Sequence, residues 1–213
     1  MSSRKILFHI NSLGKGGAER VVSLLADYFA KKGYQVKIIT LWRAEEEYEL
    51  SPAVTRINME ELQRKRKGRI SRAVGRLWDF RMCIRREKPD LVISFCNKAN
   101  FRCAYAMLGM KIPLLVSVRN DPKVDYKPYP LATRRMEKKA KGCVFQTSEA
   151  KSFFASELQK KSRLIMNPMN PKYLSEDNRW MDSPEKCHMI TVGRLSEQKN
   201  QLLLLRAFCQ IMI

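Results

Sequence analysis

The sequence contains no apolar run approaching the roughly 20 residues of a membrane-spanning helix, and its first residues lack the apolar segment and cleavage site of a secretory signal. The sequence also lacks the cysteine spacing of disulfide-rich domains and metal sites. Its six cysteines are dispersed, without a CxxC pair and without a histidine at ligand spacing. These absences predict a cytoplasmic protein with reduced thiols and no metal site. With 45% hydrophobic and 29% charged residues, the 213-residue chain has the composition of a globular protein.

Short apolar segments alternate with helical patterns along most of the chain. The first segment, KILFHI, precedes a glycine-rich loop and a helical pattern that ends near Gly33, a plausible residue to follow a helix. Six further strand-like segments follow, YQVKIITLW, VTRIN, DLVISF, PLLVSV, CVFQT and RLIM. Strands that alternate with helices predict an α/β fold, here a Rossmann-like, open and mostly parallel sheet with helices on both faces.

The composition changes after this predicted sheet domain, which spans residues 1–166. Residues 167–186 contain three prolines, several polar residues and no clear periodicity, which predicts a linker. Residues 187–213 then offer one strand, CHMITV, and one apolar helix, QLLLLRAF. One strand and one helix cannot bury a core of their own, so we expect this segment to be the incomplete start of a second α/β domain.

Gly14, Gly16 and Gly17 lie between the first strand and the first helix, in the stretch HINSLGKGGAER. Glycines at such a turn permit positive φ angles and let an anion approach the N–H groups of the helix N-terminus. A tight turn without a ligand explains them equally well. A dinucleotide site would require GxGxxG and an acidic residue after the second strand, where this chain has ITLWR. That disfavours NAD, while NADP bound through Arg43 stays open.

The net charge of +20 is unevenly distributed, because residues 62–88 carry eleven Lys and Arg against two Asp and Glu. This segment predicts a helix whose apolar side chains face the core: Ile70, Val74, Leu77 and Ile84. Its arginines, including Arg69, Arg72 and Arg76, are predicted to occupy the remaining surface. Such a helix suits an anionic membrane surface.

An ordinary solvated helix face and a nucleic-acid partner are the alternatives for this basic segment. We expect its aromatic residues, Trp78 and Phe80, to pack inside the protein rather than to stack on bases. The sequence also contains no recognisable nucleic-acid-binding module. Nucleic acid is therefore disfavoured, although a basic nucleic-acid-binding or NADP-binding α/β protein remains the alternative function.

Six motifs, in order, resemble the retaining glycosyltransferases of family 4: SLGKGGAERVV, KPDLVISF, VSVRNDP, VFQTSEAKSFF, LIMNPM and VGRLSEQKNQLLLLRAF. The resemblance implies the N-terminal half of a two-domain GT-B fold, followed by the first strand and helix of a truncated second domain. It implies hexosyl transfer, with retention, from a nucleotide-sugar, UDP-linked, to an acceptor, without a further cofactor. With the basic helix, it suggests a lipid-linked acceptor in cell-surface polysaccharide or glycan synthesis, and a peripheral position at the cytoplasmic membrane face.

The resemblance also assigns roles to single residues. Gly16 and Gly17 match the glycine loop that lines the family's cleft. Arg194 and Lys199 match the pair that grips the donor diphosphate, where fixed cations stabilise the charge that develops on the leaving group.

Arg119 and Asn120 are the candidate catalytic residues, because they follow the strand PLLVSV at the sheet edge where open parallel sheets bind ligands. The stretch RNDP is also good turn chemistry without any ligand. Relatives place a histidine near this edge, and here there is none; we expect His9 and His188 to be neutral core residues. The family's E-x7-E motif is absent too, so we expect the 213-residue polypeptide to be inactive alone.

Overall fold

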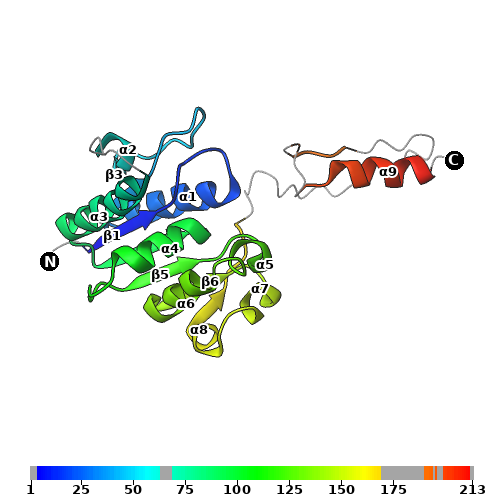
Figure 1. The fold of residues 1–213 in the computed structure, drawn as a ribbon. Coiled ribbons are helices and arrows are strands. Elements are labelled where there is room, and N and C mark those ends of the chain that lie inside the picture. Colours follow the sequence, from blue (N-terminus) through cyan, green and yellow to red (C-terminus); the bar gives the residue numbers. More distant parts are fainter. Residues whose placement is uncertain (1–3, 63–68, 169–189, 194, 196–198, 212–213) are drawn as a thin grey trace. The chain divides into compact units, whose positions relative to one another are not determined.

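The computed structural model describes residues 4–62, 69–168, 190–193, 195 and 199–211, of which residues 62, 69–72 and 211 are described by their backbone alone. The chain divides into two units, Met1–Pro168 and Met169–Ile213, which are drawn in Figure 1. Each unit is described by itself below.

A seven-stranded sheet, parallel throughout, forms the centre of the described part of the first unit. Its strands are β1 (Lys5–His9), β2 (Gln35–Thr40), β3 (Val54–Asn58), β4 (Leu91–Phe95), β5 (Leu114–Ser117), β6 (Gly142–Phe145) and β7 (Ser162–Leu164). The order across the sheet is β3-β2-β1-β4-β5-β6-β7. The predicted Rossmann-like α/β class is confirmed, and each of the seven strand-like segments overlaps a strand.

Helices connect these strands. They are α1 (Gly17–Lys31), α2 (Met59–Leu62), α3 (Arg69–Glu87), α4 (Asn97–Ala106), α5 (Pro122–Asp125), α6 (Pro130–Lys139), α7 (Ser148–Ser152) and α8 (Ser156–Lys160). α1 ends as its sequence predicts, with Gly33 at a φ of 84° and its N–H donating to the carbonyl of Ala30.

The two faces of the sheet are covered by different helices (Figure 1). On one face α1 packs over the β1–β2 half, where Phe8, Val22 and Ile38 belong to one buried cluster. On the other face α3, α4 and α6 contribute to a second cluster, which extends from Leu7 to Phe145. Both faces therefore exclude water from β1, and this explains why its sequence is an unbroken apolar run rather than an alternating one.

The burial of α3 corrects two predictions. Val74 is 64% exposed and Trp78 is 56% exposed, whereas Phe80 and Ile84 are fully buried. At about 100° per residue, Val74 and Trp78 lie about 120° and 160° around the axis from Phe80, which places both outside the core-facing stripe centred on that residue. Val74 and Trp78 instead share a solvent-facing line with Met82, which is 44% exposed.

The second unit contains α9 (Gln201–Ile211), which confirms the predicted apolar helix. Leu202–Leu205 are all about half exposed in it. The predicted strand CHMITV is not formed by its described residues, 190–192, and its first three residues lie outside the described part. A strand requires a neighbour for its ladder of hydrogen bonds, and the described part of this unit contains no second strand. No helix among the described residues has the length and apolar character needed to cross a membrane.

The corrected burial of α3 gives a direct test. Phe80→Ala removes a fully buried ring beside His9 and should lower the free energy of unfolding by about 3–5 kcal/mol. Val74→Ala, on the same helix but exposed, should change it by no more than about 0.5 kcal/mol. Urea unfolding of the 213-residue chain measures both, and equal losses would contradict the assigned helix face.

Candidate active site at the carboxyl edge of the sheet

The glycine loop follows β1, and its conformation differs from the prediction. Positive φ angles among the described glycines occur at Gly33 and Gly109, and not at Gly14, Gly16 or Gly17. Gly16 is the N-cap of α1 in an extended conformation, with a φ of −107°. The loop therefore does not need glycine for backbone conformation, and what remains is the space around each glycine.

The three glycines use that space differently. A Cβ atom on Gly14 would lie 3.2 Å from the Cβ of Ala44, so this glycine lets the chain's own 44–47 segment approach. A Cβ on Gly16 would collide with the carboxylate of Glu19, which folds back over the loop. A Cβ on Gly17 would meet nothing within 4 Å. Gly14 therefore has a packing role, and Gly17 is the position where the backbone is open to a ligand.

The turn from β4 to α4 lies next to the glycine loop, because β4 is the neighbour of β1 in the sheet. Its central residue, Cys96, has a φ of 71°, which is unusual for a residue with a side chain. The N–H of Cys96 donates to the carbonyl of Ser117 at 3.1 Å and so joins the ends of β4 and β5. Strained positions of this kind persist where the surrounding structure holds them, and they concentrate at functional sites.

Arg119 and Asn120 lie just after β5, as predicted. The guanidinium of Arg119 lies over the ring of Phe95, with its Cζ 5.9 Å from the ring centroid, and donates to the side chain of Asn167. Asn120 donates to a carboxylate oxygen of Asp125 at 3.0 Å. Arg119 is thus oriented by two neutral groups, which supports its interpretation as a ligand-binding residue. The hydrogen bond of Asn120 to Asp125 lies within the turn and supports the alternative interpretation, a turn without a ligand.

Charges around Arg119 connect the elements of this edge. Burial lowers the pKa of Arg119, while the nearby Cys96 and Glu19 raise it. Burial also raises the pKa of the Cys96 thiol to about 12, with Glu19 acting in the same direction and Arg119 opposing it. Cys96 is therefore a neutral thiol at physiological pH. The three groups come from α1, the β4–α4 turn and the β5 loop, which places the glycine loop and Arg119 at one site.

A second polar cluster lies at the same edge, on the α3–α4 side. His9, the last residue of β1, is fully buried, and its Nδ1 lies 2.9 Å from the carbonyl oxygen of Ile39. Its Nε2 lies 2.8 Å from Nη1 of Arg102, which also donates to Oδ1 of Asn11 at 3.2 Å. His9 is thus a buried core histidine, as expected. It nevertheless lies at the carboxyl edge of the sheet, where no histidine was predicted from the sequence. Arg102 is a position that the sequence did not single out, because nothing in the pattern of α4 distinguishes it.

The remaining predicted site residues are placed unevenly. Lys199 is exposed, two residues before α9, and Arg194 lies outside the described residues. Arg69 and Arg72 lie in the first turn of α3, and Arg76 is exposed one turn further on. Since α3 leads into β4, which runs parallel to the other strands, the first turns of α3 lie toward the carboxyl edge.

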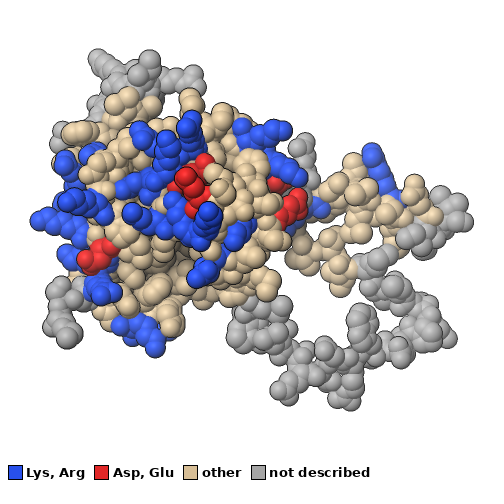
Figure 2. Space-filling model, turned by 90° about the horizontal axis from the view of Figure 1, so that it is seen from below, with Lys and Arg blue, Asp and Glu red and all other residues tan. Residues whose placement is uncertain are grey.

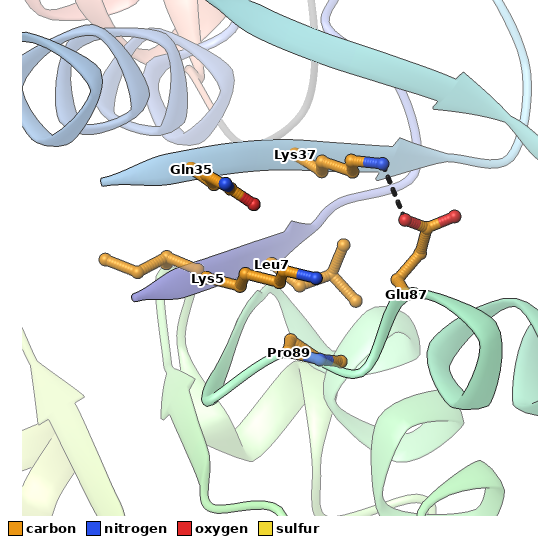
Figure 3. Close-up of a pocket in the computed structure, with 7 residues that line it drawn as sticks. Lys5, Leu7, Gln35, Lys37, Glu87 and Pro89 are labelled. Carbon is orange, nitrogen blue, oxygen red and sulfur yellow. Dashed lines mark hydrogen bonds and ion pairs between the residues drawn. The ribbon is translucent and has the colours of Figure 1, made fainter. Parts of the chain in front are cut away.

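A pocket lies at the opposite edge and is not the candidate site. Figure 3 shows Lys5, Gln35 and Pro89 around it, at the amino ends of the strands, with the ion pair between Lys37 and Glu87 at 2.6 Å. Open parallel sheets bind ligands at the carboxyl ends of their strands. We therefore assign a structural role to this ion pair, which ties α3 to β2.

A model of the family described as Glycosyltransferase Family 4 matches residues 15–172 of the chain. The match begins in the glycine loop and includes the β4–α4 turn and the segment after β5. The chain therefore belongs to glycosyltransferase family 4.

One curated relative, from Campylobacter jejuni subsp. jejuni serotype O:2, is 25% identical over 209 residues. It is described as a GalNAc-alpha-(1->4)-GalNAc-alpha-(1->3)-diNAcBac-PP-undecaprenol alpha-1,4-N-acetyl-D-galactosaminyltransferase. The aligned region is 97% of this chain and 57% of the relative. The chain thus spans little more than half the length of the relative that it resembles.

Solved structures with a similar fold include Anabaena HepE in complex with UDP and glucose, at a TM-score of 0.57 and 14% identity. The match covers 79% of this chain and 46% of that one. The lipopolysaccharide outer core galactosyltransferase WaaB gives a TM-score of 0.57 at 15% identity, covering 78% and 46%. These likenesses confirm the GT-B type of fold, over about half of each neighbour's chain.

The burial of His9 predicts a pH dependence of stability. Burial, together with the charge of Arg102, lowers the pKa of His9 to about 3, against the hydrogen bond to Ile39 that raises it. The unfolded chain, with an ordinary pKa, binds one more proton than the folded chain between about pH 6.5 and pH 3. Protonation of His9 in the unfolded chain should therefore lower the free energy of unfolding by about 1.4 kcal/mol for each pH unit as the pH falls through that window.

His9→Gln isolates this contribution, because the acidic groups titrate equally in both proteins. The variant should be less stable at pH 7.5, and its loss of stability between pH 6 and pH 4.5 should be shallower than that of the wild type. Urea unfolding at several pH values measures the difference. Parallel curves would show that His9 does not enter the folded state as a neutral imidazole.

Proposed function

We propose that this chain supplies the acceptor-side domain of a glycosyltransferase that moves a sugar from a UDP-linked nucleotide-sugar to a lipid-linked acceptor. Family membership supports the reaction class, and the curated relative's undecaprenol-linked substrate supports the acceptor class. The observation that carries the proposal is the convergence of the glycine loop, the strained β4–α4 turn and Arg119 at one sheet edge. That edge is where such sheets bind their ligands.

Charge stabilisation is the chemistry that this edge can supply. When the glycosidic bond of the donor breaks, the leaving nucleoside diphosphate gains negative charge, and fixed cations in a dry site lower the barrier. Arg119 meets this requirement, because it is half-buried and oriented by Phe95 and Asn167 rather than neutralised by an ion pair among the described residues. Lys199 precedes the N-terminus of α9, a second setting that favours phosphate.

Retention of configuration belongs to this proposal. No carboxylate is proposed as a nucleophile, and a front-face attack assisted by the leaving phosphate needs none. Asn120, beside Arg119, is the neutral group placed to orient the acceptor or the leaving oxygen once its bond to Asp125 is exchanged.

The NADP alternative loses its main support. Arg43, the residue that would hold the 2′-phosphate, donates to Oε1 of Glu61 at 3.1 Å. Both side chains are exposed, so this pair is weak, but a carboxylate at this position disfavours a second negative group. The nucleotide-sugar proposal therefore remains ahead.

The surface of α3 supports a peripheral position on an anionic membrane, at the cytoplasmic face. Val74, Trp78 and Met82 form an exposed apolar line along α3. Arg76, Arg85 and Arg86 are exposed on the same helix. Apolar and tryptophan side chains flanked by cations are typical of helices that lie in the lipid interface. The exposed tryptophan thus adds an apolar contact to the charge argument.

Positive charge is not confined to α3. Figure 2 shows Lys and Arg side chains spread over one face of the first unit, with few acidic side chains among them. Exposed cations on and after α6 include Arg134, Arg135, Lys138, Lys141, Lys160, Lys161 and Arg163. Charge alone therefore does not identify the membrane-facing surface, and the two surfaces need to be compared directly.

The transfer reaction tests the proposed function. In a polypeptide that also includes a complete second domain, Lys199→Ala should lower kcat by about a hundredfold or more, because the leaving diphosphate loses a cation. Lys111→Ala removes an exposed lysine from the first unit and serves as the control. We expect the 213-residue polypeptide alone to show no turnover with a nucleotide-sugar and a lipid-linked acceptor. Unchanged kcat in Lys199→Ala, or NADPH turnover that depends on Arg43, would contradict the proposal.

Liposome flotation tests the membrane surface. Changing Arg69, Arg72 and Arg76 to Glu should abolish binding to anionic vesicles, since each cation near such lipid contributes about 1 kcal/mol. Trp78→Ser should weaken the binding without changing the charge. The same charge reversal at Arg134, Arg135 and Lys138 on α6 is the matched control. If the α6 variant loses binding and the α3 variant keeps it, or if duplex DNA outcompetes the vesicles, α3 is not the membrane surface.

A further inference from the structure

Arg102 of α4 has an unusual set of partners. Its Nη1 is bonded to Nε2 of His9 and donates to Oδ1 of Asn11, and both of these acceptors are neutral. Among the described residues no carboxylate forms a salt bridge with Arg102. A charged side chain taken largely out of water is costly unless an opposite charge accompanies it. The site around Arg102 therefore lacks an anion.

A neighbouring positive charge makes this deficit larger. The positive charge that acts on Arg102 comes from Arg76, on the neighbouring helix α3. Burial lowers the pKa of Arg102, Cys103 raises it, and Arg76 lowers it further. A guanidinium keeps its proton at physiological pH despite such effects, so two like charges share this edge of the sheet. Repulsion between them is relieved when an anion binds to both.

Arg102 is also held in a defined orientation. Because the carbonyl of Ile39 can only accept, Nδ1 of His9 must carry the proton and Nε2 must present its lone pair to Arg102. The His9 ring packs against Phe80, with 4.4 Å between ring centroids, which fixes its plane. Nη1 of Arg102 is thereby occupied, while Nε and Nη2 have no acceptor in the described part of the chain. Two adjacent donors on a planar group match two oxygens of a phosphate.

We propose that Arg102, oriented by His9 and assisted by Arg76, binds the phosphate or diphosphate group of the lipid-linked acceptor. This inference rests on the proposed function for the identity of the ligand. The position favours the acceptor over the donor, because Arg102 lies beside α3, the helix with the exposed apolar line, whereas the predicted donor-binding pair belongs to the second unit. His9 is a positioning residue in this arrangement, since it acts only through Arg102.

Binding of two soluble probes, inorganic pyrophosphate and farnesyl diphosphate, to the 213-residue chain tests the inference without any sugar transfer. Arg102→Gln should lower the affinity for both probes by about tenfold or more, which is the loss expected for a pair of charge-assisted hydrogen bonds. Arg76→Gln, at an exposed position that leaves the fold intact, should weaken both by a few fold. Lys111→Gln removes one positive charge from an exposed position outside α3 and should leave both affinities unchanged.

A measurement on the wild type covers the case in which Arg102→Gln does not fold. In protein with ¹⁵N-labelled arginine, the Nε–H resonance of Arg102 should shift on titration with pyrophosphate, and that of Arg85 should not. An unmoved Arg102 resonance at saturation, or farnesyl diphosphate binding that is insensitive to Arg102→Gln, would overturn the inference and leave the proposed function standing. Arg102-dependent binding of UDP alone would assign the site to the donor and overturn it as well.

The proposed function fails in a distinguishable way. If both diphosphate probes bind through Arg102 and the longer polypeptide transfers no sugar to a lipid-linked acceptor, the subsite is supported and the reaction is wrong. If the binding of pyrophosphate depends on Arg102 and farnesyl diphosphate does not bind, the site binds a free phosphate species, and its assignment to the acceptor lipid is overturned.

Discussion

The parallel pairing of β1 with β4 is the constraint on which the candidate site depends. Its register, with His9 opposite Ser94, brings the glycine loop after β1 level with the turn that begins α4. The chain passes from β1 outward through β2 and β3 before it returns to β4 on the other side. No other pair of neighbouring strands in this sheet is separated in this way, and ligands of open parallel sheets bind where the strand order reverses.

This pairing gives the two faces of the edge different characters. On the α1 side, Phe95 supports Arg119, and Glu19 lies close enough to act on both Arg119 and Cys96. On the α3–α4 side, His9 supports Arg102, and no carboxylate of the described residues forms an ion pair with it. Both arginines are oriented by neutral groups within the described residues, which leaves their charge available to a ligand. Two separate cationic positions at one edge suit the proposed reaction, in which donor and acceptor would both contain phosphate.

Much of the fold could be predicted from the sequence, because buried parallel strands produce short apolar runs that are easily recognised. The end of α1 near Gly33 could be predicted as well, because a glycine that follows a helical pattern is a local signal. The exposed line of α3 was mispredicted because the apolar residues of a helix were assigned to the core by spacing alone. Val74 and Trp78 are apolar, yet they lie about 120° and 160° around the axis from the buried Phe80 and are exposed.

The candidate site was predictable only where a local motif marks it. Arg119 and the glycines could be placed at the edge, although the glycines turned out to provide space rather than positive φ. The pair of His9 and Arg102 joins residues 93 positions apart, and its geometry arises from strand order and helix packing that no local pattern encodes. Cys96 could not be anticipated either, because strain at a single residue depends on the strands around it.

Hydrogen exchange of backbone amides, with and without a polyprenyl diphosphate-linked saccharide, tests the central claim most directly. If the carboxyl edge of the first unit binds the acceptor, protection should increase in the glycine loop from residue 14 to residue 20, in the β4–α4 turn and in the first turns of α3 and α4. The amides around Pro89, at the opposite edge, should exchange as before. Protection confined to the Pro89 edge, or none in the glycine loop at saturating acceptor, would contradict the account.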